Sequence, residues 1–395
     1  MDASRATPPA RAGAPPPTEG AGPHPTEGPR AARIAWTTVR FLGALFVFVG
    51  ALQVMKTGAR DLDILQTGGF LVRNAGSTLG LGWLGPLFVL TGSPVAATAL
   101  TLVKAGEEAA AAGQAHFTEI QGFTMLTGSR LGAAFVVLVV ASIYALRGGE
   151  GERRKPVSTA VMALSTTAMV YVPSAFLGYA ILKWPPFQSL DLQFPHQFSD
   201  LLDLLYGSLL ARLEGLPGAL VFLAGLGVLL VSFKLIDVVV PTLDERAIGE
   251  ERLGWLRRKW PMFGFGCLVA LVTMSVSVAL TVLVPLVAKR FAKREDILPY
   301  IMGANITTLG DTMLAGLALH SPAAVRIVLA QVIAATLISV LLLVFFYPQI
   351  RTGVFRFQRK VVRSRPRLAV FTVGLFLVPI AIIVTAGLAL PEAAG

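Results

Sequence analysis

Long apolar stretches separated by short polar or basic segments run along most of this chain. Seven of the stretches carry few charges and reach the roughly 20 residues that a transmembrane helix needs. They lie near 33–56, 121–146, 157–182, 218–240, 297–319, 323–348 and 368–390. The pattern predicts an all-α polytopic membrane protein with about seven full crossings.

Two further apolar stretches, 77–103 and 261–288, are interrupted near their middle by small polar residues. The interruptions read LTGSPVAATALTLVKAG from Leu90 and MSVSVALTVLVPL from Met274. Polar breaks are costly in hydrocarbon unless they line a cavity or a binding site, so both stretches are predicted to be re-entrant helical hairpins. Basic residues flank 261–288 on both sides, and only a hairpin keeps both clusters in the cytoplasm, as the positive-inside rule requires.

Each predicted hairpin is followed by a second polar break, GSRLGAA from Gly128 and GANITT from Gly303. Gly43 and Gly128 are 85 residues apart, and so are Gly218 and Gly303. The hairpin strings do not keep this spacing, so the match requires compensating insertions. Because the crossings near 33–56 and 218–240 run in opposite directions, the pattern predicts two inverted-topology repeats, which are typical of carriers.

The remaining segments complete the predicted organisation. Residues 1–32 are rich in Pro, Ala and Gly and are expected to form a disordered cytoplasmic tail. The other predicted parts are a first repeat at 33–182, an extracellular loop at 183–217 with an amphipathic segment at 200–215, a second repeat at 218–348, a basic cytoplasmic loop at 349–367 and an extra transmembrane helix in 368–395. This topology places the N-terminus in the cytoplasm and the C-terminus outside, and the Ala-, Arg- and Pro-rich composition favours a bacterial inner membrane.

Charge and composition narrow the function classes. The net charge of +11 comes from Lys and Arg in short loops, which indicates cytoplasmic retention rather than nucleic-acid binding. Cys267 is the only cysteine and the four histidines are scattered, so neither a disulfide nor a metal site is expected. Without paired carboxylates or a nucleophile beside a base, we expect no enzyme activity and no cofactor.

The polar breaks are the candidate binding site. A hairpin tip presents the N-terminus of a short helix, which suits an anion, and its oxygens can hold a sodium ion. The small residues of a tip equally allow close helix packing. Arg130 lies 175 residues before Asn305, and two roles stay open for it: a clamp for an oxyanion or an internal ion pair with Asp311.

The chain resembles the sodium/phosphate cotransporter family (the type II, bacterial NptA-like group) over residues 35–348. LGALFVFVGALQVMKTG from Leu42 is similar to the family's first helix, and LPYIMGANITT from Leu298 to its second-half Gly-Ala-Asn-Ile motif. The hairpin strings lie where the family has its repeated Gln-Ser-Ser-Ser signature. Here Leu90 and Met274 replace the glutamines, and Arg130 stands where the first-half motif would have Asn, so the chain resembles a divergent member of that family.

The resemblance implies inverted repeats whose hairpins meet near the midplane, and sodium-driven symport of inorganic phosphate through the lipid bilayer. Phosphate or a related small anion would be held at the two tips, and Arg130 would bind the same anion if it acts as the oxyanion clamp. Sodium would bind near the tips. The resemblance implies the substrate residues Thr91, Gly92, Ser93, Ser275, Val276 and Ser277, and Arg130 is added to them by its own position and chemistry. The candidate sodium residues are Ser129, Asn305, Thr307 and Thr308.

Two alternatives to the coupled transporter remain. The first is a sodium-independent anion carrier in which Arg130 supplies the positive charge. The second is a non-transporting membrane sensor or scaffold that has lost the site. A homo-oligomer is compatible with all three.

Overall fold

The computed structural model describes residues 30–62, 69–113, 117–147, 154–190, 196–213, 215–239, 258–274, 279–280 and 297–388. Within these residues the regular elements are all helical. The chain divides into two units, Met1–Arg40 and Phe41–Gly395. In the first unit, the start of α1 (Arg30–Arg60) places the Arg40 guanidinium 4.8 Å from the ring centroid of Trp36.

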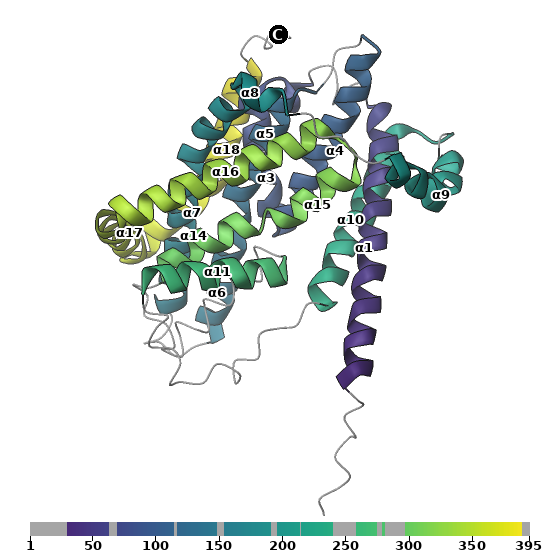
Figure 1. Cartoon of the computed structure of the whole chain (residues 1–395). Helices are drawn as coiled ribbons and strands as arrows, with labels where there is room; N and C mark the ends of the chain where they lie inside the picture. The colour runs from purple at the N-terminus through teal and green to yellow at the C-terminus, as the bar shows by residue number, and fades with distance from the viewer. Residues whose placement is uncertain are drawn as a thin grey trace, which may run out of the picture. The chain divides into compact units, whose positions relative to one another are not determined.

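The second unit contains the rest of α1 and all other described helices (Figure 1). In chain order they are η1 (Phe70–Val72), α3 (Ala75–Val89), α4 (Ser93–Ala111), α5 (Glu119–Ala133), α6 (Phe135–Arg147), α7 (Arg154–Lys183), α8 (Pro185–Gln188), α9 (His196–Leu213), α10 (Gly218–Val239), α11 (Lys259–Thr273), α14 (Ile297–Thr307), α15 (Gly310–Ala318), α16 (Pro322–Phe345), α17 (Tyr347–Val362) and α18 (Arg365–Leu388).

Six stretches of the described chain are long and apolar enough to cross a membrane. They are Ala35–Arg60, Glu119–Ile143, Pro156–Lys183, Gly218–Ile236, Pro322–Phe345 and Arg365–Leu388. Each coincides with a predicted crossing. The prediction of an all-α integral membrane protein is therefore confirmed for the part of the chain that the structure describes.

The seventh predicted crossing, 297–319, is wrong as a single helix. It consists of α14 and α15, with a turn at Thr308 and Leu309 between them. The Thr308 hydroxyl donates to the Asn305 carbonyl at 3.1 Å, and the Leu309 N–H donates to the Ile306 carbonyl at 3.2 Å. These bonds tighten the last turn of α14 and end it inside the apolar stretch.

The first predicted hairpin corresponds to a helix–turn–helix at the expected residues. The 15-residue α3 ends at Leu90, whose φ of 61° lies in the left-handed region, and α4 begins at Ser93. At 1.5 Å per residue α3 is about 22 Å long, which is shorter than a hydrocarbon core of roughly 30 Å. Its length therefore fits a helix that enters a membrane without crossing it.

The second predicted hairpin begins in the same way. α11 also has 15 residues and ends at a left-handed residue, Met274, with φ 47°. Ser275, Val276 and Ser277 lie outside the described residues, as does nearly all of the chain between 275 and 296.

Two polar segments are also helical. Residues 349–367, expected to be a loop, belong mostly to α17, whose buried Ile350, Val354 and Val361 have helical spacing. The predicted amphipathic segment at 200–215 lies in α9, where the Tyr206 hydroxyl donates to the Phe46 carbonyl of α1 at 2.8 Å. The predicted tail at 1–32 lies outside the described residues up to residue 29.

Candidate functional site

The site is built on two helix crossings, and the first joins α3 to α5. Among the described helices, α3 and α5 form the most extensive pair. A Cβ atom at Gly82 would lie 2.1 Å from the Met125 carbonyl oxygen, and one at Gly128 would lie 2.2 Å from the Leu79 carbonyl oxygen. Only glycine permits so close an approach of the two backbones.

The second crossing joins α11 to α14 with the same geometry. A Cβ atom at Gly266 would lie 2.1 Å from the Tyr300 carbonyl oxygen, and one at Gly303 would lie 2.1 Å from the Phe263 carbonyl oxygen. In both crossings each glycine faces the carbonyl three residues before the partner glycine. The same local arrangement therefore occurs twice in the chain.

The distance from glycine to helix end is also repeated. Gly82 precedes the left-handed Leu90 by eight residues, and Gly266 precedes the left-handed Met274 by eight. These pairs are 184 residues apart in sequence, whereas Gly303 follows Gly128 by 175. The nine-residue difference falls between the left-handed residue that ends the first helix of each crossing and the glycine of the second helix, Gly128 or Gly303.

One turn further along each crossing the two copies differ. A Cβ atom at Gly132 would lie 2.2 Å from the Trp83 carbonyl oxygen. At the corresponding place the Thr307 hydroxyl donates to the Cys267 carbonyl at 2.9 Å. Thr307, predicted as a sodium ligand, thus joins α14 to α11.

The tip of the first hairpin packs against α5. A Cβ atom at Gly92 would lie 2.7 Å from the Ser129 carbonyl oxygen and 2.8 Å from the Ala133 Cβ. Ser93 is buried and Thr91 half-buried, and the Ser129 hydroxyl donates to the carbonyl of Leu126 at 2.7 Å. The close packing explains the glycine and also brings the tip beside the residue that precedes Arg130.

Arg130 forms an internal ion pair. Its side chain is 1% exposed, and one guanidinium nitrogen lies 3.5 Å from Oδ1 of Asp311, which is 4% exposed. The same nitrogen donates to the Thr312 hydroxyl, and the other terminal nitrogen donates to the Thr308 carbonyl at 3.4 Å. The charge of α5 is thus balanced by α15, and its guanidinium reaches the turn between α14 and α15.

The pair does not use all of its hydrogen-bonding capacity. Arg130 Nε and Asp311 Oδ2 are buried and have no hydrogen-bond partner among the described residues. A guanidinium can bind a carboxylate through two parallel bonds, but here one long contact joins them. Because buried ionic groups are costly to leave unpaired, Arg130 Nε and Asp311 Oδ2 are candidate contacts for a polar ligand.

Asn305 occupies the position in α14 that Arg130 occupies in α5, but its contacts are with α7. Its side-chain amide donates to the Thr167 hydroxyl at 3.1 Å, and its backbone carbonyl accepts from the Tyr171 hydroxyl at 2.6 Å. Sequence reasoning missed Thr167 and Tyr171. Three consecutive hydroxyl residues, 165–167, interrupt the predicted crossing 157–182 and are the signal that would have found Thr167.

A second buried polar contact lies between α5 and α16. The Thr127 hydroxyl donates to the Gln331 side-chain carbonyl, and both residues are fully buried. Thus the second helix of each crossing is bonded through polar side chains to a long helix: α5 to α16, and α14 to α7.

The structure therefore brings Arg130, Thr308 and Asn305 into one buried polar region, with Ser129 beside the first hairpin tip. The oxygens available there belong to hydroxyls, carbonyls and one carboxylate, the kinds that coordinate sodium in carriers. The described residues contain no cluster of three or more His, Cys, Asp or Glu side chains of the kind that holds a metal ion.

Sequence and structure comparisons add no relative to this picture. No family model, no curated protein and no solved structure matches this chain. The resemblance to the sodium/phosphate cotransporter family therefore rests on the residues of this chain alone.

Proposed function

We propose that this protein is a secondary transporter that moves phosphate or a related small anion by alternating access, with sodium as the coupling ion. In this proposal residues 33–182 and 218–348 are inverted repeats, and α3–α4 and the chain from α11 onward are re-entrant hairpins. The proposed location is a bacterial inner membrane, with the N-terminus in the cytoplasm and the C-terminus outside.

The observation that carries the proposal is the repeated glycine crossing. Gly82 with Gly128 and Gly266 with Gly303 fix two short helices against two others in the same way. Each short helix ends at a left-handed residue, Leu90 or Met274, within an apolar stretch. Duplicated, interrupted helices of this kind are the usual framework of carrier binding sites.

The Arg130–Asp311 pair gives the proposal its chemistry. An anion that enters beside the first hairpin tip would compete with Asp311 for the guanidinium and bind its free Nε. The two charges are joined by one direct contact of 3.5 Å and by the Thr312 hydroxyl, which accepts from Arg130 and donates to Asp311 at 2.8 Å. A tetrahedral oxyanion that replaced the carboxylate would exchange the long direct contact for hydrogen bonds from the guanidinium. Asp311 is then an internal substitute for the substrate.

Binding of labelled phosphate to the purified full chain, with and without sodium, tests the proposal. We expect sodium to increase phosphate binding and Arg130→Gln to abolish it. Asp311→Asn should tighten binding, because it removes the competing carboxylate while keeping the guanidinium. Arg326→Gln is a matched control, because Arg326 pairs with Glu119 away from this region.

Two results would contradict the coupled transporter. Phosphate binding that needs Arg130 but is unchanged when sodium is replaced would favour the sodium-independent carrier, which the permanent charge at Arg130 supports. No binding of any tested anion, together with no flux in proteoliposomes, would favour a sensor or scaffold with Arg130 and Asp311 as a structural pair.

A further inference from the structure

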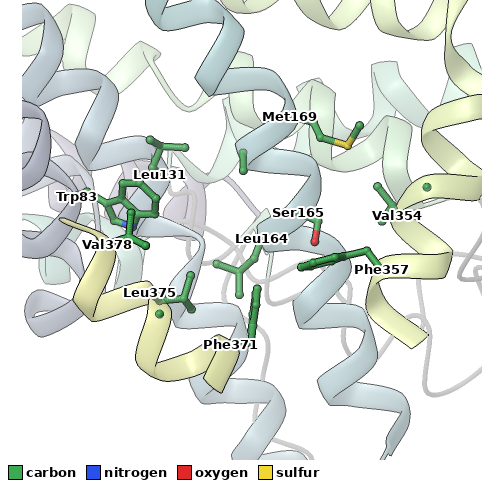
Figure 2. Close-up of a pocket in the computed structure, with 13 residues that line it drawn as sticks. Trp83, Leu131, Leu164, Ser165, Met169, Val354, Phe357, Phe371, Leu375 and Val378 are labelled. Atoms are coloured by element: carbon green, nitrogen blue, oxygen red, sulfur yellow. The ribbon is translucent and has the colours of Figure 1, made fainter. Parts of the chain in front are cut away.

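An apolar cavity lies on the side of the protein formed by α17 and α18. It has a volume of about 490 Å³, and its walls come from α3, α5, α7, α17 and α18. Figure 2 shows the rings of Trp83, Phe357 and Phe371 among the side chains that surround Leu164. Nearly all of the lining is carbon, so the cavity suits a hydrocarbon rather than a polar solute.

The polar groups of the lining offer little to a polar ligand. The Ser165 hydroxyl already donates to the Val161 carbonyl of its own helix at 2.7 Å. The Trp83 indole nitrogen is a donor without a hydrogen-bond partner among the described residues, but it is a single group in an apolar wall. None of the described residues that line the cavity is charged.

Two glycines leave space in the wall. A Cβ atom at Gly353 of α17 or at Gly374 of α18 would meet no atom within 4 Å. A Cβ atom is therefore accommodated at both positions, and close helix packing does not require these two glycines.

The helix beside the cavity carries positive charge. Residues 347–367 contain seven Lys or Arg and no Asp or Glu. Val354 of α17 is buried, Gln358 is bonded to Ser158 of α7, and Arg356 and Lys360 are exposed. Arg356 follows Gly353 by three residues and Lys360 follows Phe357 by three, so each basic side chain is a surface neighbour of a residue that lines the cavity.

An amphipathic helix of this kind is suited to the interface between hydrocarbon and headgroups, with its basic face toward anionic lipid. We propose that the cavity holds an acyl chain of an anionic phospholipid, whose phosphate is bound by Arg356 and Lys360. Charge complementarity selects the anionic headgroup, and the carbon lining selects the chain. The described lining of this site includes Leu131 but not Arg130, Asp311 or Asn305.

Native mass spectrometry of the purified full chain tests the proposal. The probes are phosphatidylglycerol and phosphatidylcholine with the same acyl chains. We expect phosphatidylglycerol to remain bound at detergent concentrations that remove phosphatidylcholine, with at least a tenfold difference in affinity. Equal retention of the two lipids would overturn the proposal.

Glycine variants locate the bound lipid. Gly353→Leu and Gly374→Leu should each fill the cavity and reduce phosphatidylglycerol binding at least tenfold. Gly227→Leu and Gly264→Leu are matched controls, because a Cβ atom at either also meets no atom within 4 Å and neither lines the cavity. An equal loss in all four variants, or no loss in any, would overturn the assignment to this cavity.

Headgroup variants test the other half of the proposal. The double variant Arg356→Gln, Lys360→Gln should bind the two lipids equally, because the chain site remains and the charge is lost. Arg40→Gln, a basic residue in α1, should leave the preference unchanged. If filling the cavity instead changed the oligomeric state of the protein, its occupant would be a second copy of the chain and the lipid proposal would fail.

Discussion

The α3–α5 and α11–α14 crossings share a backbone geometry but differ in their polar chemistry. In the first crossing Arg130 extends to Asp311 on α15, whereas in the second Asn305 bonds to Thr167 on α7. Two of the glycines that set the helix contact are matched, Gly82 by Gly266 and Gly128 by Gly303. The comparison teaches that packing and chemistry are separable here, since a neutral amide and a guanidinium occupy matching places in nearly identical frames.

The difference also has an electrostatic consequence. Asn305 requires no counter-ion, but Arg130 requires one because its side chain is removed from water. Asp311 supplies it from the helix that follows α14. The asymmetry between the two crossings therefore ties the first half of the chain to the second.

The largest expected effect comes from removing the charge that only the first crossing has. Arg130→Gln leaves Asp311 buried and unpaired, which should destabilise the protein by about 3–5 kcal/mol. The double variant Arg130→Gln, Asp311→Asn removes both charges and should recover most of that loss. Thermal unfolding of the purified variants measures both, and a double variant less stable than either single one would contradict a simple ion pair.

The next effect should be equal in the two crossings. Gly82→Ala and Gly266→Ala each place a Cβ about 2 Å from a carbonyl oxygen and should lower stability by roughly 1–3 kcal/mol through overpacking. Gly264→Ala is the control, since it lies on α11 two residues before Gly266 and its Cβ meets no atom. A loss in only one crossing, measured by thermal unfolding, would break the equivalence.

A smaller effect distinguishes the crossings at Thr307. Thr307→Val removes the hydrogen bond to the Cys267 carbonyl and should cost about 1 kcal/mol, while Thr307→Ser should keep most of the stability. If Thr307 also coordinates sodium, valine should additionally weaken sodium-dependent phosphate binding and serine should not. Equal stability of the valine and serine variants would show that the hydroxyl does not hold α14 to α11.

The smallest effect concerns the end of the first hairpin, where Glu108 of α4 meets α1. Partial burial opposes ionisation of Glu108, but the hydrogen bond from Arg60 and the charges of Lys56, Arg60 and Lys104 hold its pKa below the ordinary value. Arg60 Nε lies 2.5 Å from the carboxylate and Lys56 Nζ lies 3.3 Å from it.

The sign of the pH dependence follows from that pKa. A carboxylate with a lowered pKa in the folded state stabilises the protein above its unfolded pKa, and this contribution is lost as the pH falls through the folded pKa. We therefore expect Glu108→Gln to lower the Tm at pH 7 and to flatten the decrease of Tm below about pH 4.5. A parallel curve for wild type and variant would contradict this role.

The sequence pattern was sufficient to predict the helix break in the first hairpin. It also showed that Arg130 and Asn305 occupy equivalent positions in the two halves. Small polar residues within apolar stretches identified Leu90 to Ser93, and α3 ends there. A constant spacing of 175 residues related Arg130 to Asn305, and both lie two residues after a crossing glycine.

Other features could not be read from the pattern in the same way. Both an oxyanion clamp and an ion pair fitted Arg130, because its distance to Asp311 depends on how α5 packs beside α15. The turn at Thr308 was hidden because hydropathy averaged over 297–319 stays apolar across it. The sequence predicts a loop at 349–367 because its seven basic residues obscure the helical spacing of Ile350, Val354 and Val361.

The Arg130–Asp311 pair also bears on how the protein is made. Arg130 and Thr312, the neighbour of Asp311, are 182 residues apart in sequence. The ribosome therefore completes α5 long before it synthesises the counter-ion Asp311. An arginine at the centre of a lone transmembrane segment adds about 2.5–3.5 kcal/mol to its insertion free energy. During biogenesis the apolar residues of Glu119–Ile143 must therefore offset this cost without help from Asp311. The charge of Arg130 stays without its counter-ion until the second half of the chain enters the bilayer.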